Sequence, residues 1–357
     1  MPGPCACGRP REAGGKLLLI TDAWRPQVNG VVTAFEHMKR ELEKRSFNVV
    51  VIHPALFRNI RFPLYPEIRL ALFPGRSIAR TLEREQPDYI HIATEGPLGL
   101  AARTLCLRHG LRFTTSYHTH FQLYIHVRFR MFLGLTYRLL SWFHKAAART
   151  LVATPRLKTA LEAHDFKHLA LWPLGVDAEF FVRNAQPSAP NLQKPVFLFF
   201  SRLAPEKNPE EFLKLDLAGT KLVIGDGPDR RALEAKYGHA ALFVGAKKGQ
   251  ELVDWLSRAD VLVFPSRTET FGLVILESLA CGVPVAAHDA MGPKDIITHG
   301  IDGHIGEDLK EAALACLKLN PARCREKAGR YSWEASADAF ISHLEPCRAE
   351  RESASIA

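Results

Sequence analysis

The feature that most constrains the fold is an alternation of short apolar runs with patterns of helical spacing, repeated in two series along the 357-residue chain. In the first series, Val31, Phe35, Met38 and Leu42 recur at helical spacing between two apolar runs. A chain needs a crossover connection, usually a helix, to return to a parallel neighbouring strand. We therefore predict a parallel sheet in the first half, with strands at residues 16–21, 48–53, 88–92, 112–116 and 150–153.

A proline-rich segment without periodicity, residues 173–195, separates the two series and is interpreted as an interdomain linker. The second series predicts strands at residues 196–200, 221–224, 241–244, 261–264 and 284–287, and helices at 209–215 and 333–344. The pattern is typical of an α/β protein with two Rossmann-like, doubly wound domains in tandem. The expected parts are a disordered lead-in at 1–15, domains at 16–176 and 177–332, and a closing helical segment at 333–357 that packs back toward the first domain.

Composition bounds the class of protein. Hydrophobic residues make up 47% and charged residues 24%, as in ordinary soluble domains. No apolar run approaches the roughly 18–20 residues of a transmembrane helix, and residues 1–15 lack the apolar core of a secretory signal. Seven widely spread cysteines, an odd number, argue against a disulfide framework and favour the reducing cytoplasm.

Charge is unevenly distributed. Residues 1–176 contain 25 Lys and Arg against 12 Asp and Glu, whereas residues 177–357 contain 22 against 26. Residues 96–161 contain ten basic residues and no acidic one. This imbalance predicts that the first domain meets an anionic partner, with a solvated basic surface as the alternative.

The second domain contains a candidate anion site. Arg202 and Lys207 lie between the strand 196–200 and the next helix, for which Asn208 and Pro209 are the expected N-cap and first residue. Two cations beside a helix N-terminus, at the carboxyl end of a strand, suit a diphosphate.

Two carboxylates flank a second helix start further along the chain. Glu269 precedes it and Glu277 lies within it, and Thr270 is the expected N-cap of a helix that begins at 271–272. The amides at this start would point at the same diphosphate. The alternative for Glu277 is a half-buried carboxylate that the backbone satisfies.

In this order, the motifs resemble those of family 4 glycosyltransferases, retaining enzymes that use nucleotide-activated sugars. The resemblance implies the GT-B fold, in which the two Rossmann-like domains face each other across a cleft. The resemblance implies that Arg202 and Lys207 bind the donor diphosphate, that Glu269 contacts the transferred sugar, and that Glu277 binds the ribose. It further implies donor contacts near the base and around the phosphates from Lys247, Thr270, Phe271, Gly272 and Leu273.

The first domain carries the resemblance too. Residues 22–32 resemble the family's glycine loop, with Gly30 facing the donor, and residues 94–99 and 116–121 resemble the branch of bacterial GDP-mannose-dependent α-mannosyltransferases and of sulfoquinovosyl or glucosyl lipid synthases. His118 falls where the family places a histidine near the anomeric centre. The implied catalytic set is His118, Arg202, Lys207 and Glu269, and the implied acceptor-side residues are Asp22, Asn29, Tyr117 and His120.

The resemblance implies retaining transfer of a hexose, mannose from GDP-mannose, to a lipid-linked or glycan acceptor in glycolipid or lipopolysaccharide synthesis. It implies no metal and no cofactor beyond the nucleotide sugar, and the chain contains no Asp-x-Asp. The alternative in the same class is a UDP-sugar-dependent glucosyl- or sulfoquinovosyltransferase. An NAD-dependent dehydrogenase is disfavoured because no Gly-x-Gly-x-x-Gly opens the first domain. A nucleic-acid-binding protein would leave the acidic half unexplained, so no nucleic-acid partner is expected.

Two basic segments with aromatic residues, 58–80 and 128–145, suggest peripheral contact with an anionic membrane surface from the cytoplasm. In the second segment, a polar stripe at helical spacing is predicted to comprise Arg130, Gly134, Arg138, Ser141 and Lys145. The alternative is a core helix with a solvated basic stripe.

Overall fold

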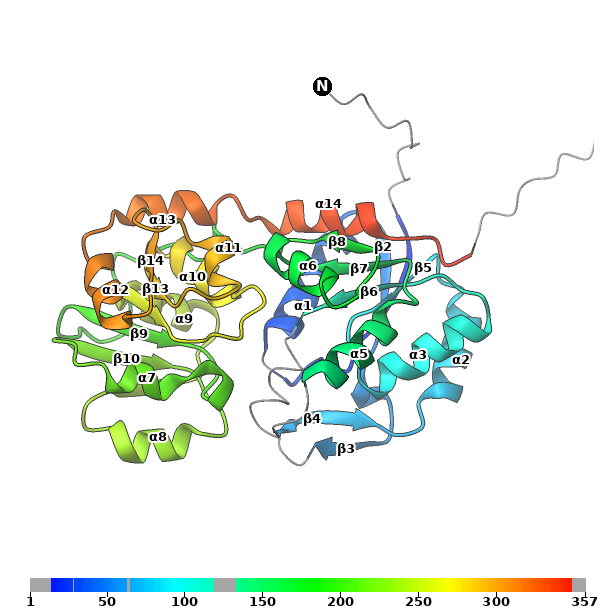
Figure 1. The fold of residues 1–357 in the computed structure, drawn as a ribbon, viewed down its shortest axis with the longest axis horizontal. Helices are drawn as coiled ribbons and strands as arrows, with labels where there is room; N and C mark the ends of the chain where they lie inside the picture. The colour runs from blue at the N-terminus through cyan, green and yellow to red at the C-terminus, as the bar shows by residue number, and fades with distance from the viewer. Residues whose placement is uncertain (1–13, 28, 63–64, 119–132, 349–357) are drawn as a thin grey trace, which may run out of the picture.

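The computed structural model describes residues 14–27, 29–62, 65–118 and 133–348. Two six-stranded sheets lie side by side, each in its own domain (Figure 1). The strand order is β2-β1-β5-β6-β7-β8 in the first sheet and β11-β10-β9-β12-β13-β14 in the second. Every neighbouring pair within the two sheets is parallel, which confirms the predicted pair of doubly wound α/β domains.

The strands of the two sheets are β1 Gly15–Ile20, β2 Phe47–Ile52, β5 Tyr89–Ile92, β6 Thr114–Tyr117, β7 Arg149–Val152, β8 Leu169–Leu171, β9 Val196–Phe200, β10 Thr220–Ile224, β11 Leu242–Gly245, β12 Val261–Phe264, β13 Val285–Ala287 and β14 Gly303–Ile305. An antiparallel hairpin, β3 Asn59–Phe62 and β4 Tyr65–Ala71, occupies part of the basic segment 58–80. The hairpin was not predicted, nor were the edge strands β8 and β14.

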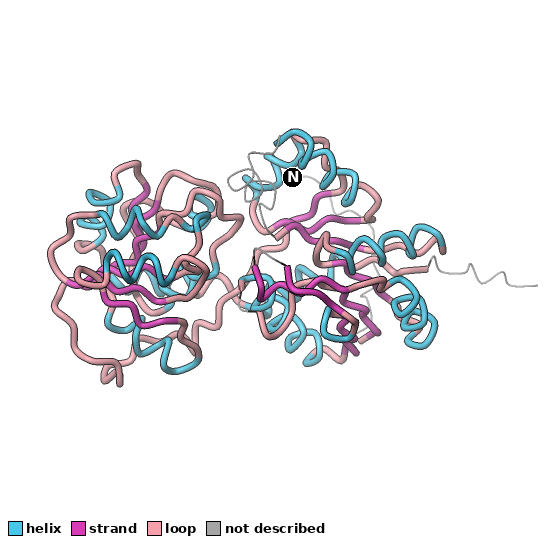
Figure 2. Tube along the Cα trace, turned by 90° about the horizontal axis from the view of Figure 1, so that it is seen from below, coloured by secondary structure: helices cyan, strands magenta, loops and turns pink. Residues whose placement is uncertain are grey.

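Helices flank the strands of the first domain on both sides (Figure 2). Leu17 and Leu19 therefore pack into one apolar cluster, while Leu18 and Ile20 pack into another, as the alternation of side chains along a strand requires. The helices of the first domain are α1 Gly30–Lys44, α2 Gly75–Glu85, α3 Pro97–Arg108, α5 Leu133–His144 and α6 Pro155–Glu162. Those that follow are α7 Pro209–Lys214, α8 Arg230–Tyr237, α9 Gly249–Arg258, α10 Leu273–Ala280, α11 Pro293–Ile296, α12 Leu309–Cys316, α13 Pro321–Ala328 and α14 Trp333–His343, with short 3-10 turns η1 Pro54–Leu56 and η2 Pro205–Lys207.

The chain passes between the domains twice, and the two passages touch. The Val176 amide donates to the Tyr331 carbonyl at 2.9 Å. A Cβ on Gly175 would lie 2.5 Å from the backbone of Ser332, so only glycine fits this close approach. The segment predicted as a linker therefore runs directly against the chain that enters α14.

Helix α14 lies over the first domain (Figure 1). The Trp333 ring stacks on His37 of α1 with 4.6 Å between centroids, and Arg45 Nε lies 3.0 Å from Asp338 Oδ1. Just beyond the helix, Glu345 pairs with Arg112 at 3.2 Å and with Arg149 at 3.0 Å. These contacts attach the closing segment to the first sheet.

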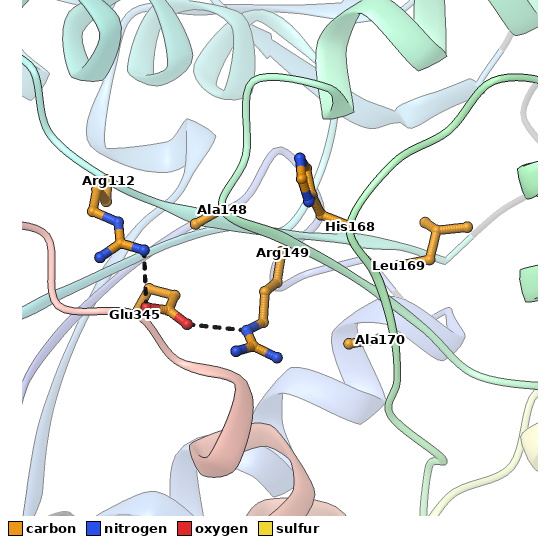
Figure 3. A pocket seen from close by; sticks show the side chains of 7 residues that line it. All are labelled: Arg112, Ala148, Arg149, His168, Leu169, Ala170 and Glu345. Atoms are coloured by element: carbon orange, nitrogen blue, oxygen red, sulfur yellow. Dashed lines mark hydrogen bonds and ion pairs between the residues drawn. The ribbon is translucent and has the colours of Figure 1, made fainter. Parts of the chain in front are cut away.

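A cavity of about 350 Å³ opens beside this Glu345 cluster (Figure 3). Its lining comes from the amino ends of β6, β7 and β8, including Arg149 and His168. It therefore lies at the sheet edge opposite to the carboxyl ends, where doubly wound folds bind their ligands. In the described part of the chain, no helix is long and apolar enough to cross a membrane.

Candidate active site

The carboxyl edge of the second sheet brings Lys207 and Glu269 together. Lys207 ends the turn η2, which follows β9, and Glu269 follows the neighbouring strand β12. Lys207 Nζ donates to Glu269 Oε2 at 2.5 Å, and the two side chains are only 13% and 16% exposed. Because a lysine ammonium has three donors, Lys207 can hold Glu269 and a phosphate oxygen at the same time. Arg202 lies five residues earlier, in the same connection.

Both helix starts beside this pair are built differently from the prediction. Asn208 occupies the cap position before Pro209, but its backbone is left-handed with φ 50°, and its side-chain amide donates to Glu211 instead of capping. Gly272, with φ 100°, precedes α10. The Thr270 hydroxyl does not cap this helix either. It donates to the His118 carbonyl at 2.5 Å and so joins the two domains.

The starts of α1 and α10 face each other across the domain boundary. Asn29 caps α1 by accepting from the Val32 amide at 3.0 Å. A Cβ on Gly30, the first residue of α1, would have Leu273 Cδ1 as its nearest neighbour among the described residues, at 3.8 Å. Leu273 is the first residue of α10. Two partial positive helix ends therefore converge at the domain boundary, which favours an anion there. Glu269 lies beside the second of them, since its Cγ would be 3.4 Å from a Cβ on Gly272.

His118 follows β6 and lies in an apolar cage. Its ring packs edge-on against Phe35 and Trp172, with centroids 5.1 and 5.3 Å away. Its buried Nε2 has no hydrogen-bond partner among the described residues. Burial, and then the neighbouring His144, lowers the pKa of His118 to about 3. The imidazole is therefore neutral at physiological pH and offers one hydrogen bond to a ligand hydroxyl.

Two expected acceptor-side residues, Asp22 and Tyr117, have structural contacts, as Asn29 does at the start of α1, and their role at the acceptor stays a prediction. The Asp22 carboxylate is buried and accepts from the Leu98 and Gly99 amides at 3.0 and 3.3 Å, so it caps α3. Burial raises the pKa of Asp22, against the effect of these hydrogen bonds. Tyr117 is buried against Phe166 in an apolar cluster. His120, the remaining acceptor-side candidate, lies outside the described residues.

Glu277 and Lys247 differ in how they are held. Among the described residues the Glu277 carboxylate has no hydrogen bond or ion pair, so the backbone does not satisfy it as the alternative reading required. Burial raises the pKa of Glu277 to about 7. Lys247 lies at the start of α9 and pairs with Glu251 at 2.5 Å. The described contacts do not join Lys247 to Lys207 or Glu269.

One pair of residues had no assigned role in the sequence. His144, buried at the end of α5, places Nε2 3.0 Å from Glu95 Oε1 and Nδ1 2.9 Å from Thr115 Oγ1. Glu95 follows β5 and is the last acidic residue before the acid-free stretch 96–161. That boundary and the resemblance of residues 94–99 drew attention to Glu95, but neither indicated His144, because 49 positions separate the two partners.

Two family models match this chain. One, described as Glycosyltransferase Family 4, matches residues 28–180, and the other, described as Glycosyl transferases group 1, matches residues 182–319. The chain belongs to glycosyltransferase family 4. Together the matches cover both domains, including the starts of α1 and α10 and the Lys207–Glu269 pair.

Relatives of this glycosyltransferase differ in the sugar they transfer. A GDP-mannose-dependent alpha-mannosyltransferase of Mycobacterium tuberculosis is 28% identical, with 95% of this chain and 98% of the relative covered. An alpha-monoglucosyldiacylglycerol synthase of Streptococcus pneumoniae is 26% identical, with 91% and 83% covered. The solved sucrose-phosphate synthase of Thermosynechococcus elongatus has a similar fold, with a TM-score of 0.75 at 18% identity over 92% of this chain and 97% of that one. The glycosyltransferase therefore has the predicted GT-B fold.

Proposed function

We propose that this glycosyltransferase transfers a hexose from a nucleotide sugar to a lipid-linked or glycan acceptor, with retention of the α configuration. The observation that carries the proposal is the Lys207–Glu269 pair beside the converging starts of α1 and α10. A cation suits the leaving diphosphate, and an adjacent carboxylate suits the hydroxyls of the transferred sugar. The mannosyltransferase relative supports GDP-mannose as the donor.

The proposed mechanism follows from where charge develops. Cleavage of the glycosidic bond leaves negative charge on the β-phosphate of the departing nucleoside diphosphate. Arg202, Lys207 and the amides at the start of α10 stabilise that charge without a metal ion. The departing phosphate takes the proton of the acceptor hydroxyl, which attacks on the same face, so no protein nucleophile is assigned. Neutral His118 donates or accepts a hydrogen bond at a sugar hydroxyl.

A second candidate donor is a UDP-sugar, which the glucosyl-transferring relative favours. Thermal unfolding with GDP, UDP, ADP and NAD tests the donor class, because a ligand that binds only the native state raises Tm. We expect GDP to give the largest shift. A shift with UDP alone would replace the mannosyl proposal by the glucosyl or sulfoquinovosyl one. A shift with NAD alone would contradict the glycosyltransferase donor site.

The outer face of α3 and α5 supports membrane contact. Leu135, Leu139 and Trp142 of α5 are 60%, 61% and 50% exposed. They recur at i, i+4 and i+7 and so share one face of the helix. The Arg103 guanidinium of α3 lies 3.9 Å from the centre of the Trp142 ring and links the two helices. Neither helix contains an acidic residue.

The exposed face of α5 differs from the predicted polar stripe. Ser141 is buried and donates to the Asp165 carbonyl at 2.9 Å, while Arg138 and Lys145 remain exposed. Arg130 lies outside the described residues. The exposed face is therefore mixed apolar and basic, a composition that suits the headgroup region of anionic lipids. We propose that this face holds the enzyme on the cytoplasmic side of a membrane that presents the acceptor.

Sedimentation with vesicles tests this membrane face. We expect the protein to pellet with phosphatidylglycerol-containing vesicles, and less well at high salt because exposed charges are screened. Leu139→Glu should weaken pelleting severalfold. The matched control is Leu314→Glu, an exposed leucine on α12 of the second domain. Equal pelleting of both variants and the wild type would contradict the assignment of the face.

A further inference from the structure

Four side chains form a continuous chain of contacts across the carboxyl edge of the second sheet. They are Glu211 of α7, Arg267 after β12, His288 after β13 and Glu307 after β14. The strands β9, β12, β13 and β14 are consecutive neighbours in the sheet. His288 Nε2 lies 2.8 Å from Glu211 Oε1, His288 Nδ1 lies 3.1 Å from Arg267 Nη2, and Arg267 Nη2 donates to Glu307 Oε2 at 2.8 Å.

The partners of His288 determine its tautomer. A guanidinium can only donate, so Nδ1 must offer its lone pair to Arg267. Nε2 then carries the proton and donates it to Glu211. His288 is fully buried, so a neutral imidazole links a cation and an anion with both ring nitrogens satisfied. A side chain without one donor and one acceptor would leave Glu211 or Arg267 without this hydrogen bond.

This chain of contacts leads directly to Lys207. The second carboxylate oxygen of Glu211 accepts from the side-chain amide of Asn208, the residue that follows Lys207 and has the left-handed backbone. On the other side of Lys207, the Glu206 carbonyl accepts from Ser266 Oγ at 3.3 Å and from Thr268 Oγ1 at 3.1 Å. The turn that carries Lys207 is therefore held from both sides against the loop that carries Glu269.

We propose that His288 is a positioning residue of the donor site, which holds Lys207 at the place of the leaving β-phosphate through Glu211 and Asn208. The inference rests on the proposed role of Lys207. It deepens that role, because a residue that acts through Lys207 affects recognition of the β-phosphate and does not affect recognition of the rest of the nucleotide. Loss of His288 should therefore weaken the binding of nucleoside diphosphates and leave the binding of nucleoside monophosphates almost unchanged.

Calorimetric titration of the full chain with GDP, UDP, GMP and UMP tests this inference. We expect His288→Leu to weaken diphosphate binding about tenfold, the loss of about one charge-assisted hydrogen bond, and to change monophosphate binding less than twofold. His288→Gln, whose amide has a donor and an acceptor, should recover most of the loss. Glu211→Ala cuts the same chain at a half-exposed side chain and should reproduce the effect if His288→Leu does not fold.

A matched control lies elsewhere in the same domain. Asp254 of α9 is buried and accepts from Asn184 at 2.8 Å and from the Ser188 amide at 3.1 Å. Asp254→Asn should lower Tm and leave the preference for diphosphate unchanged. The inference would be overturned if His288→Leu weakened the binding of mono- and diphosphates equally, or weakened the binding of neither.

The same titrations separate the two proposals. If the wild type shows no preference for a diphosphate over a monophosphate, the donor site at Lys207 is wrong. If Lys207→Ala removes that preference but His288→Leu and Glu211→Ala keep it, the donor site stands and the positioning role of His288 is wrong.

Discussion

Both domains contain a six-stranded parallel sheet, but the side chains at the carboxyl edges of the two sheets differ in chemistry. The second domain places charged groups there, with Lys207 against Glu269 and the chain Glu211–His288–Arg267 behind them. The first domain places the Asn29 cap of α1 and the low-pKa His118 there, and its carboxylates Asp22 and Glu95 are bonded to the start of α3 and to His144. On the proposed mechanism, the charged edge holds the leaving diphosphate and the facing edge admits substrate hydroxyls.

Some of the basic residues of the first domain lie away from this edge. Helix α5 carries exposed Arg138 together with exposed Leu135, Leu139 and Trp142. The following predictions test the division between a charged donor edge and a facing edge whose carboxylates are already bonded, from the largest effect to the smallest.

Lys207→Ala should have the largest effect, because it removes the cation beside the developing phosphate charge. We expect turnover to fall by about 10²–10³-fold, the usual loss for one preorganised electrostatic group, with Tm nearly unchanged. The control is Lys310→Ala, which removes an exposed lysine paired with Asp216. Turnover close to wild type in Lys207→Ala would show that the charged edge is not the donor site.

His118→Phe tests the part of the site that the first domain provides. Phenylalanine keeps the packing between Phe35 and Trp172 but removes Nε2. We expect turnover to fall about 10²-fold, within the range for loss of one hydrogen-bonding group at a reacting centre. Because the pKa of His118 is about 3, the wild-type rate should show no titration of this residue between pH 5 and 8. Full activity of the variant would remove His118 from the site.

Gly30→Ala tests whether the start of α1 faces the donor. The added Cβ meets Leu273 only at an ordinary contact distance of 3.8 Å, so stability should hold. The methyl group would occupy space between the two helix starts, and we expect donor affinity to fall about tenfold, as for one misplaced methylene-sized group. Gly75→Ala is the control, because it adds a methyl group to the first turn of α2, where no described atom lies within 4 Å. Equal donor affinity in both variants would place the donor elsewhere.

Glu277→Gln should give the smallest effect, and one that depends on pH. Burial raises the pKa of Glu277 from 4.5 to about 7, so the folded state favours the neutral form. That contribution to stability is fully present below about pH 4 and is lost as the pH rises through 7. The neutral glutamine should therefore stabilise the protein by about 1–2 kcal/mol at pH 8 and by nothing measurable at pH 4.

Thermal unfolding of Glu277→Gln and the wild type at the two pH values checks this sign. The same substitution should weaken nucleotide binding severalfold at pH 8, because a carboxylate accepts more strongly from ribose hydroxyls than an amide does. A variant that is less stable than the wild type at pH 8 would contradict the raised pKa of Glu277.

The regular strands could be predicted because each is a buried run bounded by turn residues. The predicted limits of β9 and β12, 196–200 and 261–264, agree with the structure. The hairpin β3–β4 could not be predicted in the same way, since its apolar residues are mixed with charged residues and with Pro66, and it pairs antiparallel outside the two sheets. Edge strands β8 and β14 contain three residues each and are only partly buried, unlike the equally short but fully buried β13, Val285–Ala287, which was predicted.

The sequence does not show which way a side chain points, and this limited the prediction of the site. The spacing of Lys207 and Glu269 along parallel strands indicated that they meet, because neighbouring strands end at one edge. Thr270 and Asn208 have the residue types of helix caps, yet their partners lie in the other domain and on the next turn. Asp22 similarly finds its partners at the start of α3, 76 positions away for Leu98. Local sequence carries no signal for such distant partners.

The central claim is that the charged edge of the second domain binds and releases a nucleoside diphosphate while the sugar keeps its configuration. Proton NMR of the full chain with GDP-mannose, and with UDP-glucose in parallel, follows slow hydrolysis of the donor, in which water takes the place of the acceptor hydroxyl, and the anomeric configuration of the sugar first released. We predict consumption of GDP-mannose, an α-configured first product, and loss of both in Lys207→Ala. A β-configured first product, or consumption of neither donor by the wild type, would contradict the account.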